Sequence, residues 1–233
     1  MPVDDNGLDI TSGIQNYPDA RFALITPAHQ SPLGVALSLA RRHQILEWAD
    51  RSQAWIIEDD YDSEFRYHGK PLPALKSLDA PQRVIYAGTF SKALFPALRC
   101  AWLVVPVKQI AQFRHQASLA PCAVPVLWQN TLADFLREGH FWRHLKKMRQ
   151  HYAQRRQWIE QALTQQGFQV VPQKGGIQMV IRMIGDDIAH ARKANAAGLA
   201  VQALSDWRIR SSGEGGLLLS FTNIVNEGMA RQV

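Results

Sequence analysis

The 233-residue sequence predicts an α/β fold in which a mostly parallel sheet is followed by a smaller α+β unit. Short apolar runs, each ended by polar or turn-forming residues, are typical of buried strands. A segment with helical spacing, 35–49, lies between two such runs, as expected for a helix that connects parallel strands. After Gly167 the apolar runs become shorter and glycines separate them, which indicates a second unit.

The elements are justified in chain order by the same two patterns. In the first part of the chain, apolar runs predict strands at 21–26, 54–57, 84–87 and 101–105, and we expect the first, third and fourth of these to be buried. Helical spacing predicts helices at 35–49, 107–116, 127–137 and 141–166. Past residue 167 we expect short strands at 168–171 and 178–181 and a helix at 188–197, with 200–204 and 217–221 completing the unit. We therefore expect a partial large domain at 1–125, connecting helices at 126–166 and a small C-terminal domain at 167–233.

Composition excludes several classes of protein. Hydrophobic residues make up 46% of the chain and charged residues 20%, which is ordinary for a globular protein. No run approaches the roughly 18 apolar residues of a membrane-spanning helix, and the acidic N-terminus lacks the apolar segment of a signal peptide. Cys100 and Cys122 have no metal-type spacing and lie in apolar surroundings. We expect reduced core thiols in a cytoplasmic protein without membrane contact.

The net charge of +6 raises the question of nucleic-acid binding. The basic residues concentrate between Arg143 and Arg156, on a predicted long helix, where charge usually forms a solvated face. The sequence contains no helix-turn-helix pattern, zinc-finger spacing or RNA-binding motif. We expect no DNA contact from this chain itself.

The turn after the third predicted strand carries the residues with the clearest chemistry. That strand stops at Gly88, and Thr89, Ser91 and Lys92 follow, with Arg99 seven residues beyond the lysine. A lysine amine held beside an apolar core can lose its proton and form a Schiff base with an aldehyde. The two hydroxyls and the guanidinium can hold a phosphate on the same molecule.

The preceding strand ends in carboxylates and a phenol. Asp59, Asp60 and Tyr61 follow its apolar run, and parallel strands place functional groups together at their carboxyl ends. A carboxylate, a phenol, a lysine, hydroxyls and an arginine on one rim match pyridoxal 5′-phosphate, whose aldehyde binds lysine and whose pyridinium nitrogen pairs with aspartate. The alternative for Lys92 is an ordinary solvated loop lysine.

Three motifs of this sequence resemble a known family. Segments 58–67 (EDDYDSEFRY), 88–92 (GTFSK) and 26–34 (TPAHQSPLG) resemble the aminotransferase-like domain of MocR-type regulators. These are GntR-family transcription factors whose effector domain looks like a fold type I aminotransferase. The resemblance covers nearly the whole chain. It implies an incomplete large-domain sheet, a pyridoxal 5′-phosphate cofactor, an amino-group-containing small molecule as ligand, and a homodimer in the intact family member.

The resemblance also implies what this sequence lacks. The family's domain begins with a segment that contributes several sheet strands, part of the phosphate site and an aromatic residue that stacks on the cofactor ring. A DNA-binding winged helix precedes that segment. We find neither in the sequence, which also stops inside a predicted helix. We therefore expect an N-terminally truncated chain.

By resemblance, each residue of the rim acquires a role. Lys92 carries the Schiff base and Asp59 pairs with the pyridine nitrogen. The strand period supports Asp59 over its neighbour, because Ile57 and Asp59 share one face and Asp60 takes the other. A helix cap or surface carboxylate is the alternative for Asp59. Tyr61 is expected to donate to the 3′ oxygen of the cofactor, or else to be a half-buried aromatic residue.

The phosphate is assigned to Thr89, Ser91 and Arg99. Arg99 offers a planar fork that suits phosphate, and a salt-bridged core arginine is its alternative. A hydroxyl in a turn often bonds its own backbone, and this is the alternative for Ser91.

One loop departs from the pattern of many aminotransferases. Where those enzymes have Asn-Pro-Thr-Gly, this chain has Ser31-Pro32-Leu33-Gly34, so the usual asparagine contact to the 3′ oxygen is absent. His29, just before it, is expected as either a cofactor-proximal residue or a plain loop histidine.

The substrate carboxylate requires an arginine from the small domain. Leu218 lies where many aminotransferases have arginine before Leu-Ser-Phe. Arg208 and Arg210 are the candidate substitutes, and Arg210 is favoured. The sequence thus predicts the effector-sensing part of a MocR-type regulator. The rivals are a working aminotransferase, in which Lys92 also shuttles the proton, and a degenerate remnant without cofactor.

Overall fold

The computed structural model describes residues 1–120, 124–209 and 213–232 and divides into two compact units. The first unit comprises Met1–Gln30, Val35–Glu64 and Lys70–Leu145. The second comprises Ser31–Gly34, Phe65–Gly69 and Lys146–Val233. No helix among the described residues is both long and apolar enough to cross a membrane.

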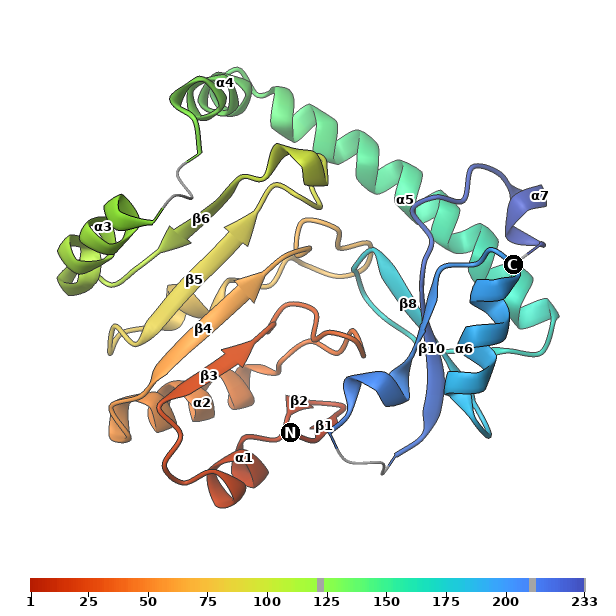
Figure 1. Ribbon diagram of the computed structural model, residues 1–233, viewed down its shortest axis with the longest axis horizontal. Helices are drawn as coiled ribbons and strands as arrows, with labels where there is room; N and C mark the ends of the chain where they lie inside the picture. Colours follow the sequence, from red (N-terminus) through yellow and green to blue (C-terminus); the bar gives the residue numbers. More distant parts are fainter. Residues whose placement is uncertain (121–123, 210–212, 233) are drawn as a thin grey trace. The chain divides into compact units, whose positions relative to one another are not determined.

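The first unit is built on a four-stranded sheet (Figure 1). Its strands lie in sequence order: β3 (Phe22–Ile25), β4 (Trp55–Asp60), β5 (Val84–Thr89) and β6 (Ala101–Val104). The first three strands are parallel, and β6 runs antiparallel to β5. The predicted mostly parallel α/β sheet is confirmed.

Helix α2 (Leu39–Arg51) packs on one face of this sheet. Ile45 and Ile56, each at most 1% exposed, belong to the core between them. Residues 35–38 were predicted as helix but are not helical. The Leu37 amide bonds the Pro27 carbonyl, and the Ser38 hydroxyl caps the helix by accepting from a backbone amide. The N-terminal segment forms a short hairpin, β1 (Val3–Asp4) and β2 (Gly7–Leu8), and helix α1 (Ile10–Asn16).

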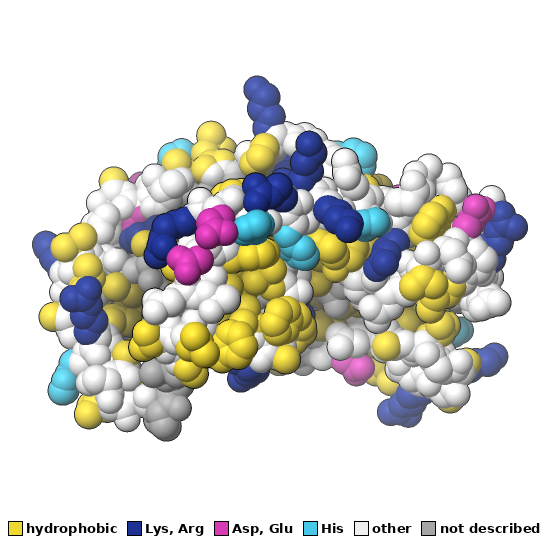
Figure 2. Space-filling model, turned by 90° about the horizontal axis from the view of Figure 1, so that it is seen from above, with side chains coloured by type: hydrophobic (Ala, Val, Ile, Leu, Met, Phe, Trp, Pro, Cys, Tyr) yellow, Lys and Arg dark blue, Asp and Glu magenta, His cyan; other side chains and the backbone are white. Residues whose placement is uncertain are grey.

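The opposite face of the sheet exposes apolar side chains. The register places Phe22 and Leu24 on this face, where they are 62% and 69% exposed. Leu103 of β6 is 55% exposed, so the prediction that β3 and β6 are buried strands is wrong. An apolar run marks a strand as able to be buried, but burial also requires a covering element. Figure 2 shows hydrophobic side chains gathered in patches between Lys, Arg and His side chains on the surface.

Buried polar groups fix the connections of the first unit. The Glu58 carboxylate is 2% exposed and accepts from the backbone amides of Leu75 and Lys76, each at 2.7 Å. These amides begin the 3₁₀ turn η1 (Leu75–Leu78). The rest of the unit consists of η2 (Pro96–Leu98), η3 (Val107–Gln109), α3 (Ile110–Leu119), α4 (Val126–Arg137) and the start of α5 (His140–Gln165).

The second unit contains an antiparallel sheet. Its strand order is β7 (Gln169–Val170), β8 (Gln178–Met183), β10 (Gly215–Ser220) and β9 (Val201–Ala203). The unit also contains α6 (Asp187–Ala196), η4 (Leu204–Trp207) and α7 (Glu227–Ala230). Met179 and Phe221 are fully buried in a core with Ile159 of α5.

Candidate cofactor site

The carboxyl ends of the three parallel strands bring the predicted site residues to one rim. His29 follows β3, Asp59 and Tyr61 lie at the end of β4, and Thr89 ends β5 with Lys92 just beyond. Asp59 is the register partner of Ala87, two residues before Thr89, so the Asp59 and Thr89 side chains share one face. This is the edge at which open parallel sheets bind ligands.

The two adjacent aspartates have different surroundings. Asp60 accepts from the Tyr86 hydroxyl at 2.8 Å and from the Ser63 hydroxyl and amide at 2.8 and 3.3 Å. Burial, followed by that hydrogen bond and the nearby carboxylates, raises the pKa of Tyr86, so the phenol remains a donor to Asp60. Asp60 therefore accepts its hydrogen bonds from residues of the chain itself, Tyr86 and Ser63.

No described residue donates a hydrogen bond to the Asp59 carboxylate. Partial burial raises its pKa, and the negative charges of Asp60 and Asp62 raise it further. A carboxylate in these surroundings lacks a positive partner. The protonated pyridine nitrogen of pyridoxal 5′-phosphate supplies a positive N–H donor, so Asp59 fits this group.

The turn after β5 is held by its own hydroxyls. The Thr89 hydroxyl lies 3.0 Å from Ser91 Oγ, and the Ser91 amide donates to Thr89 Oγ1 at 3.1 Å. The Phe90 amide bonds the Cys100 carbonyl across the turn at 3.1 Å. Cys100 is buried and free, as expected, whereas Cys122 lies outside the described residues. The two hydroxyls are thus placed side by side before any ligand binds.

The two cations of the site are exposed. Lys92 is exposed at the edge of the core, and the adjacent Ala93 is 2% exposed. Arg99 adopts a left-handed backbone, with φ 53° and ψ 35°. In the part of the chain that the structure describes, no carboxylate contacts either cation. Both are available to an aldehyde and an anion from solution.

The close approach of an indole to the backbone makes Gly88 essential to this turn. A Cβ atom at Gly88 would lie 2.3 Å from the ring of Trp102. That ring also packs against Phe90, with centroids 4.7 Å apart. Trp102 was not predicted from the sequence, because only the β5–β6 register brings it beside the glycine.

His29, Tyr61 and Asp62 form a cluster at the rim. His29 Nδ1 lies 3.2 Å from the Tyr61 hydroxyl, which in turn donates to the His29 carbonyl at 3.2 Å. The same Nδ1 lies 3.1 Å from Asp62 Oδ2, but the geometry of that approach is not that of a hydrogen bond. Asp62 was missed by sequence reasoning, since adjacency to Tyr61 was its only signal.

The predicted substrate arginine is not assessed, because Arg210 lies outside the described residues. In the second unit, Arg208 is half-buried and its guanidinium donates to the backbone carbonyl of Glu214. Leu218, at the position of an arginine in many aminotransferases, is 2% exposed.

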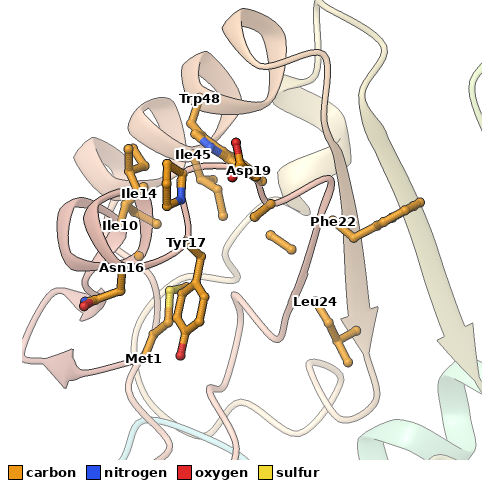
Figure 3. Close-up of a pocket in the computed structure, with 14 residues that line it drawn as sticks. Met1, Ile10, Ile14, Asn16, Tyr17, Asp19, Phe22, Leu24, Ile45 and Trp48 are labelled. Atoms are coloured by element: carbon orange, nitrogen blue, oxygen red, sulfur yellow. The ribbon is translucent and has the colours of Figure 1, made fainter.

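A cavity of about 600 Å³ lies away from these residues (Figure 3). Side chains from α1, β3 and α2 line it, among them Ile10, Leu24 and Trp48. None of the predicted site residues is among its lining, and the lining is mainly apolar. It lacks the convergent polar groups that a phosphorylated cofactor requires.

Comparisons with known proteins show the family to which the chain is similar. The family model "Aminotransferase class I and II" matches residues 4–212. The chain is 36% identical over 230 residues to the probable rhizopine catabolism regulatory protein MocR of Rhizobium meliloti, covering 96% of this chain and 46% of the relative. It is 32% identical over 222 residues to the pyridoxine biosynthesis regulator PdxR of Corynebacterium glutamicum, covering 95% and 48%.

Among solved structures, the kynurenine aminotransferase of Pyrococcus horikoshii matches with a TM-score of 0.87 and 26% identity. The match covers 100% of this chain and 60% of the enzyme. The α-aminoadipate aminotransferase LysN of Thermus thermophilus, solved with a phosphopyridoxyl-leucine adduct, gives a TM-score of 0.85 at 24% identity and covers 100% and 62%. The chain spans less than half the length of the regulators MocR and PdxR that it matches.

Proposed function

Since this chain belongs to the aminotransferase class I and II family, we propose that its first unit binds pyridoxal 5′-phosphate through a Schiff base at Lys92. The observation that carries the proposal is the Asp59 carboxylate. It is partly buried, receives no hydrogen bond from a described residue and has a raised pKa. It also shares the rim with Lys92. Asp60, by contrast, is engaged by Tyr86.

Each residue of the rim then has a task. The Lys92 amine condenses with the cofactor aldehyde and releases water. Asp59 pairs with the pyridinium N–H, and Tyr61 donates to the 3′ oxygen. When bound, the cofactor ring acts as an electron sink for an amino compound.

We assign the phosphate to Thr89, Ser91 and Arg99. The Thr89 hydroxyl donates to Ser91 Oγ at 3.0 Å, which leaves the Ser91 hydroxyl to donate to a phosphate oxygen. Arg99 adds a bidentate fork that no described carboxylate engages. A phosphate at this position neutralises the Arg99 charge and leaves Lys92 to the aldehyde.

We further propose that the site senses an amino-group-containing small molecule as part of a MocR-type regulator. Regulators are prominent among the similar proteins, and Leu218 stands where many aminotransferases have the substrate arginine. The amine of the effector would displace Lys92, and the two states of the site would differ in contacts. Arg210 remains the proposed partner of an effector carboxylate. We propose a homodimer for the intact family member and no DNA contact from this chain itself.

The test is covalent labelling. The purified chain is mixed with pyridoxal 5′-phosphate and reduced with borohydride, and its peptides are analysed by mass spectrometry. We expect the phosphopyridoxyl mass on the Lys92 peptide and its loss in Lys92→Ala, with Lys108→Ala as the matched control. Labelling spread over surface lysines, or equal labelling in Lys92→Ala, would refute the site.

A second assay separates a sensor from a working aminotransferase. A sensor shifts the visible absorbance when an amine is added and recovers it when the amine is removed. An aminotransferase converts the cofactor to its amine form, and a keto acid then regenerates it. We expect the first outcome.

A further inference from the structure

A buried histidine–aspartate pair lies against the Tyr61 hydroxyl. The His29 and Asp62 side chains are 6% and 2% exposed. His29 belongs to the loop after β3, whereas Tyr61 and Asp62 directly follow β4. The pair therefore connects the ends of two neighbouring strands beside the proposed cofactor site.

The hydrogen bonds indicate which imidazole nitrogen carries the proton. The Tyr61 hydroxyl donates its hydrogen to the His29 carbonyl at 3.2 Å. With the hydroxyl hydrogen assigned to that carbonyl, the phenol oxygen is the acceptor for Nδ1, 3.2 Å away, which assigns the imidazole proton to Nδ1. Asp62 Oδ2, 3.1 Å from Nδ1, stabilises a proton on that nitrogen electrostatically. Nε2 is buried and has no hydrogen-bond partner among the described residues.

We propose that His29 is a positioning residue: its Nδ1–H, supported by Asp62, orients the Tyr61 hydroxyl toward the cofactor. This inference rests on the proposed function, in which Tyr61 contacts the 3′ oxygen. The loop has Ser31 where many aminotransferases have an asparagine that contacts the same oxygen. His29 thus compensates indirectly, through Tyr61, for a missing direct contact.

On cofactor binding, the Tyr61 hydroxyl hydrogen would exchange one acceptor, the His29 carbonyl, for another, the 3′ oxygen of the cofactor. In the structure the Tyr61 hydrogen points to the His29 carbonyl. When an oxygen anion lies nearby, the hydrogen turns toward it, while the Nδ1–H bond still fixes the phenol oxygen. A phenol that accepts a hydrogen bond is also a stronger donor, because linked hydrogen bonds polarise one another.

The first test needs no cofactor. Long-range ¹H–¹⁵N spectra of the imidazoles report the protonated nitrogen, and His29→Asn identifies the His29 signals among the eight histidines. We expect a protonated Nδ1 in the wild type and a smaller δ-protonated fraction in Asp62→Asn. A bare Nδ1 with a protonated Nε2 would overturn the proposal.

The second test uses two amide variants on the loaded protein. The side-chain amide of asparagine places a donor near the position of Nδ1, whereas that of glutamine places one near Nε2. The readout is the pH midpoint of the visible cofactor band. We expect His29→Gln to raise this midpoint by about one unit, the size of one hydrogen bond to a charged group. His29→Asn should stay near the wild type, as should the exposed control His151→Gln.

The outcomes are distinguishable from failure of the proposed function. A wild type without any cofactor band refutes the proposed function, and the imidazole spectra still decide the role of His29. A band that shifts equally in His29→Asn and His29→Gln overturns the positioning role. A shift in His29→Asn alone would show direct contact through Nε2 instead. Asp62→Asn provides a milder variant if either substitution prevents folding.

Discussion

Substitution of the two adjacent aspartates by alanine should separate binding from stability. Asp60→Ala removes the acceptor for the Tyr86 hydroxyl and for the hydroxyl and amide of Ser63. Net contributions to a charged acceptor are about 1.5–3 kcal/mol each when buried. Since Asp60 is only partly buried, we expect the free energy of unfolding to fall by about 2–4 kcal/mol in total. Asp59→Ala removes no hydrogen bond and should change it by about 0.5 kcal/mol or less.

The sign of the Asp59 effect depends on pH. Burial and the neighbouring carboxylates raise the Asp59 pKa above its ordinary value of 3.8. The folded state therefore holds the proton more tightly than the unfolded state, and this contribution to stability is full below pH 3.8. It is lost as the pH rises through the folded pKa. Relative to Asp59→Ala, the wild type should become less stable over that interval.

Urea denaturation monitored by circular dichroism measures both unfolding free energies, and borohydride labelling measures cofactor attachment. We expect Asp59→Ala to abolish labelling at nearly unchanged stability. Asp60→Ala should lose stability, with any loss of labelling recovered at low temperature where the variant is folded. Equal destabilisation by the two substitutions, or full labelling of folded Asp59→Ala, would refute the division of roles between the two carboxylates.

Three further substitutions test the surroundings of the site. Gly88→Ala forces a Cβ against Trp102 and should cost about 1–3 kcal/mol in thermal or urea unfolding. Glu58→Ala leaves two backbone N–H groups without their acceptor and should cost about 2–5 kcal/mol in the same assay. Leu24→Lys on the exposed sheet face should reduce light scattering of the purified chain, whereas Ile184→Lys in the second unit should not.

The sequence predicted the strands and their polar ends because both are local signals. Apolar runs define β3, β4 and β5, and the strand period separates the faces of Asp59 and Asp60. The start of α2 was not predicted correctly. Leu37 fits the helical period because it is buried, yet its amide bonds the loop that follows β3.

Partners across the sheet rim had no signal in the sequence. His29 meets Tyr61 and Asp62 only because β3 and β4 are paired in one register. Tyr86 reaches Asp60 because β4 and β5 are paired in one register. Residue spacing along the chain does not encode such contacts, so Asp62 and Tyr86 became visible only in the structure.

The exposed face of the sheet contributes to a large total solvent-accessible surface of the chain. The chain exposes 14413 Å². Two separate globules, each of half its mass, would together expose about 12,800 Å². The excess agrees with the exposure of Phe22, Leu24 and Leu103 on the sheet of the first unit. We therefore expect the first unit to become more stable when this apolar face is covered.

Cofactor binding should itself stabilise the first unit, because the ligand would bind only the folded chain, in which Asp59, Lys92 and Arg99 share one rim. A ligand that binds only the folded state adds about 2.7 kcal/mol at one hundred times its dissociation constant. We expect pyridoxal 5′-phosphate to raise the thermal midpoint of the wild type and to leave Lys92→Ala and Asp59→Ala nearly unchanged. Inorganic phosphate should give a smaller rise that requires Arg99. An equal rise in all variants would place the ligand elsewhere on the chain.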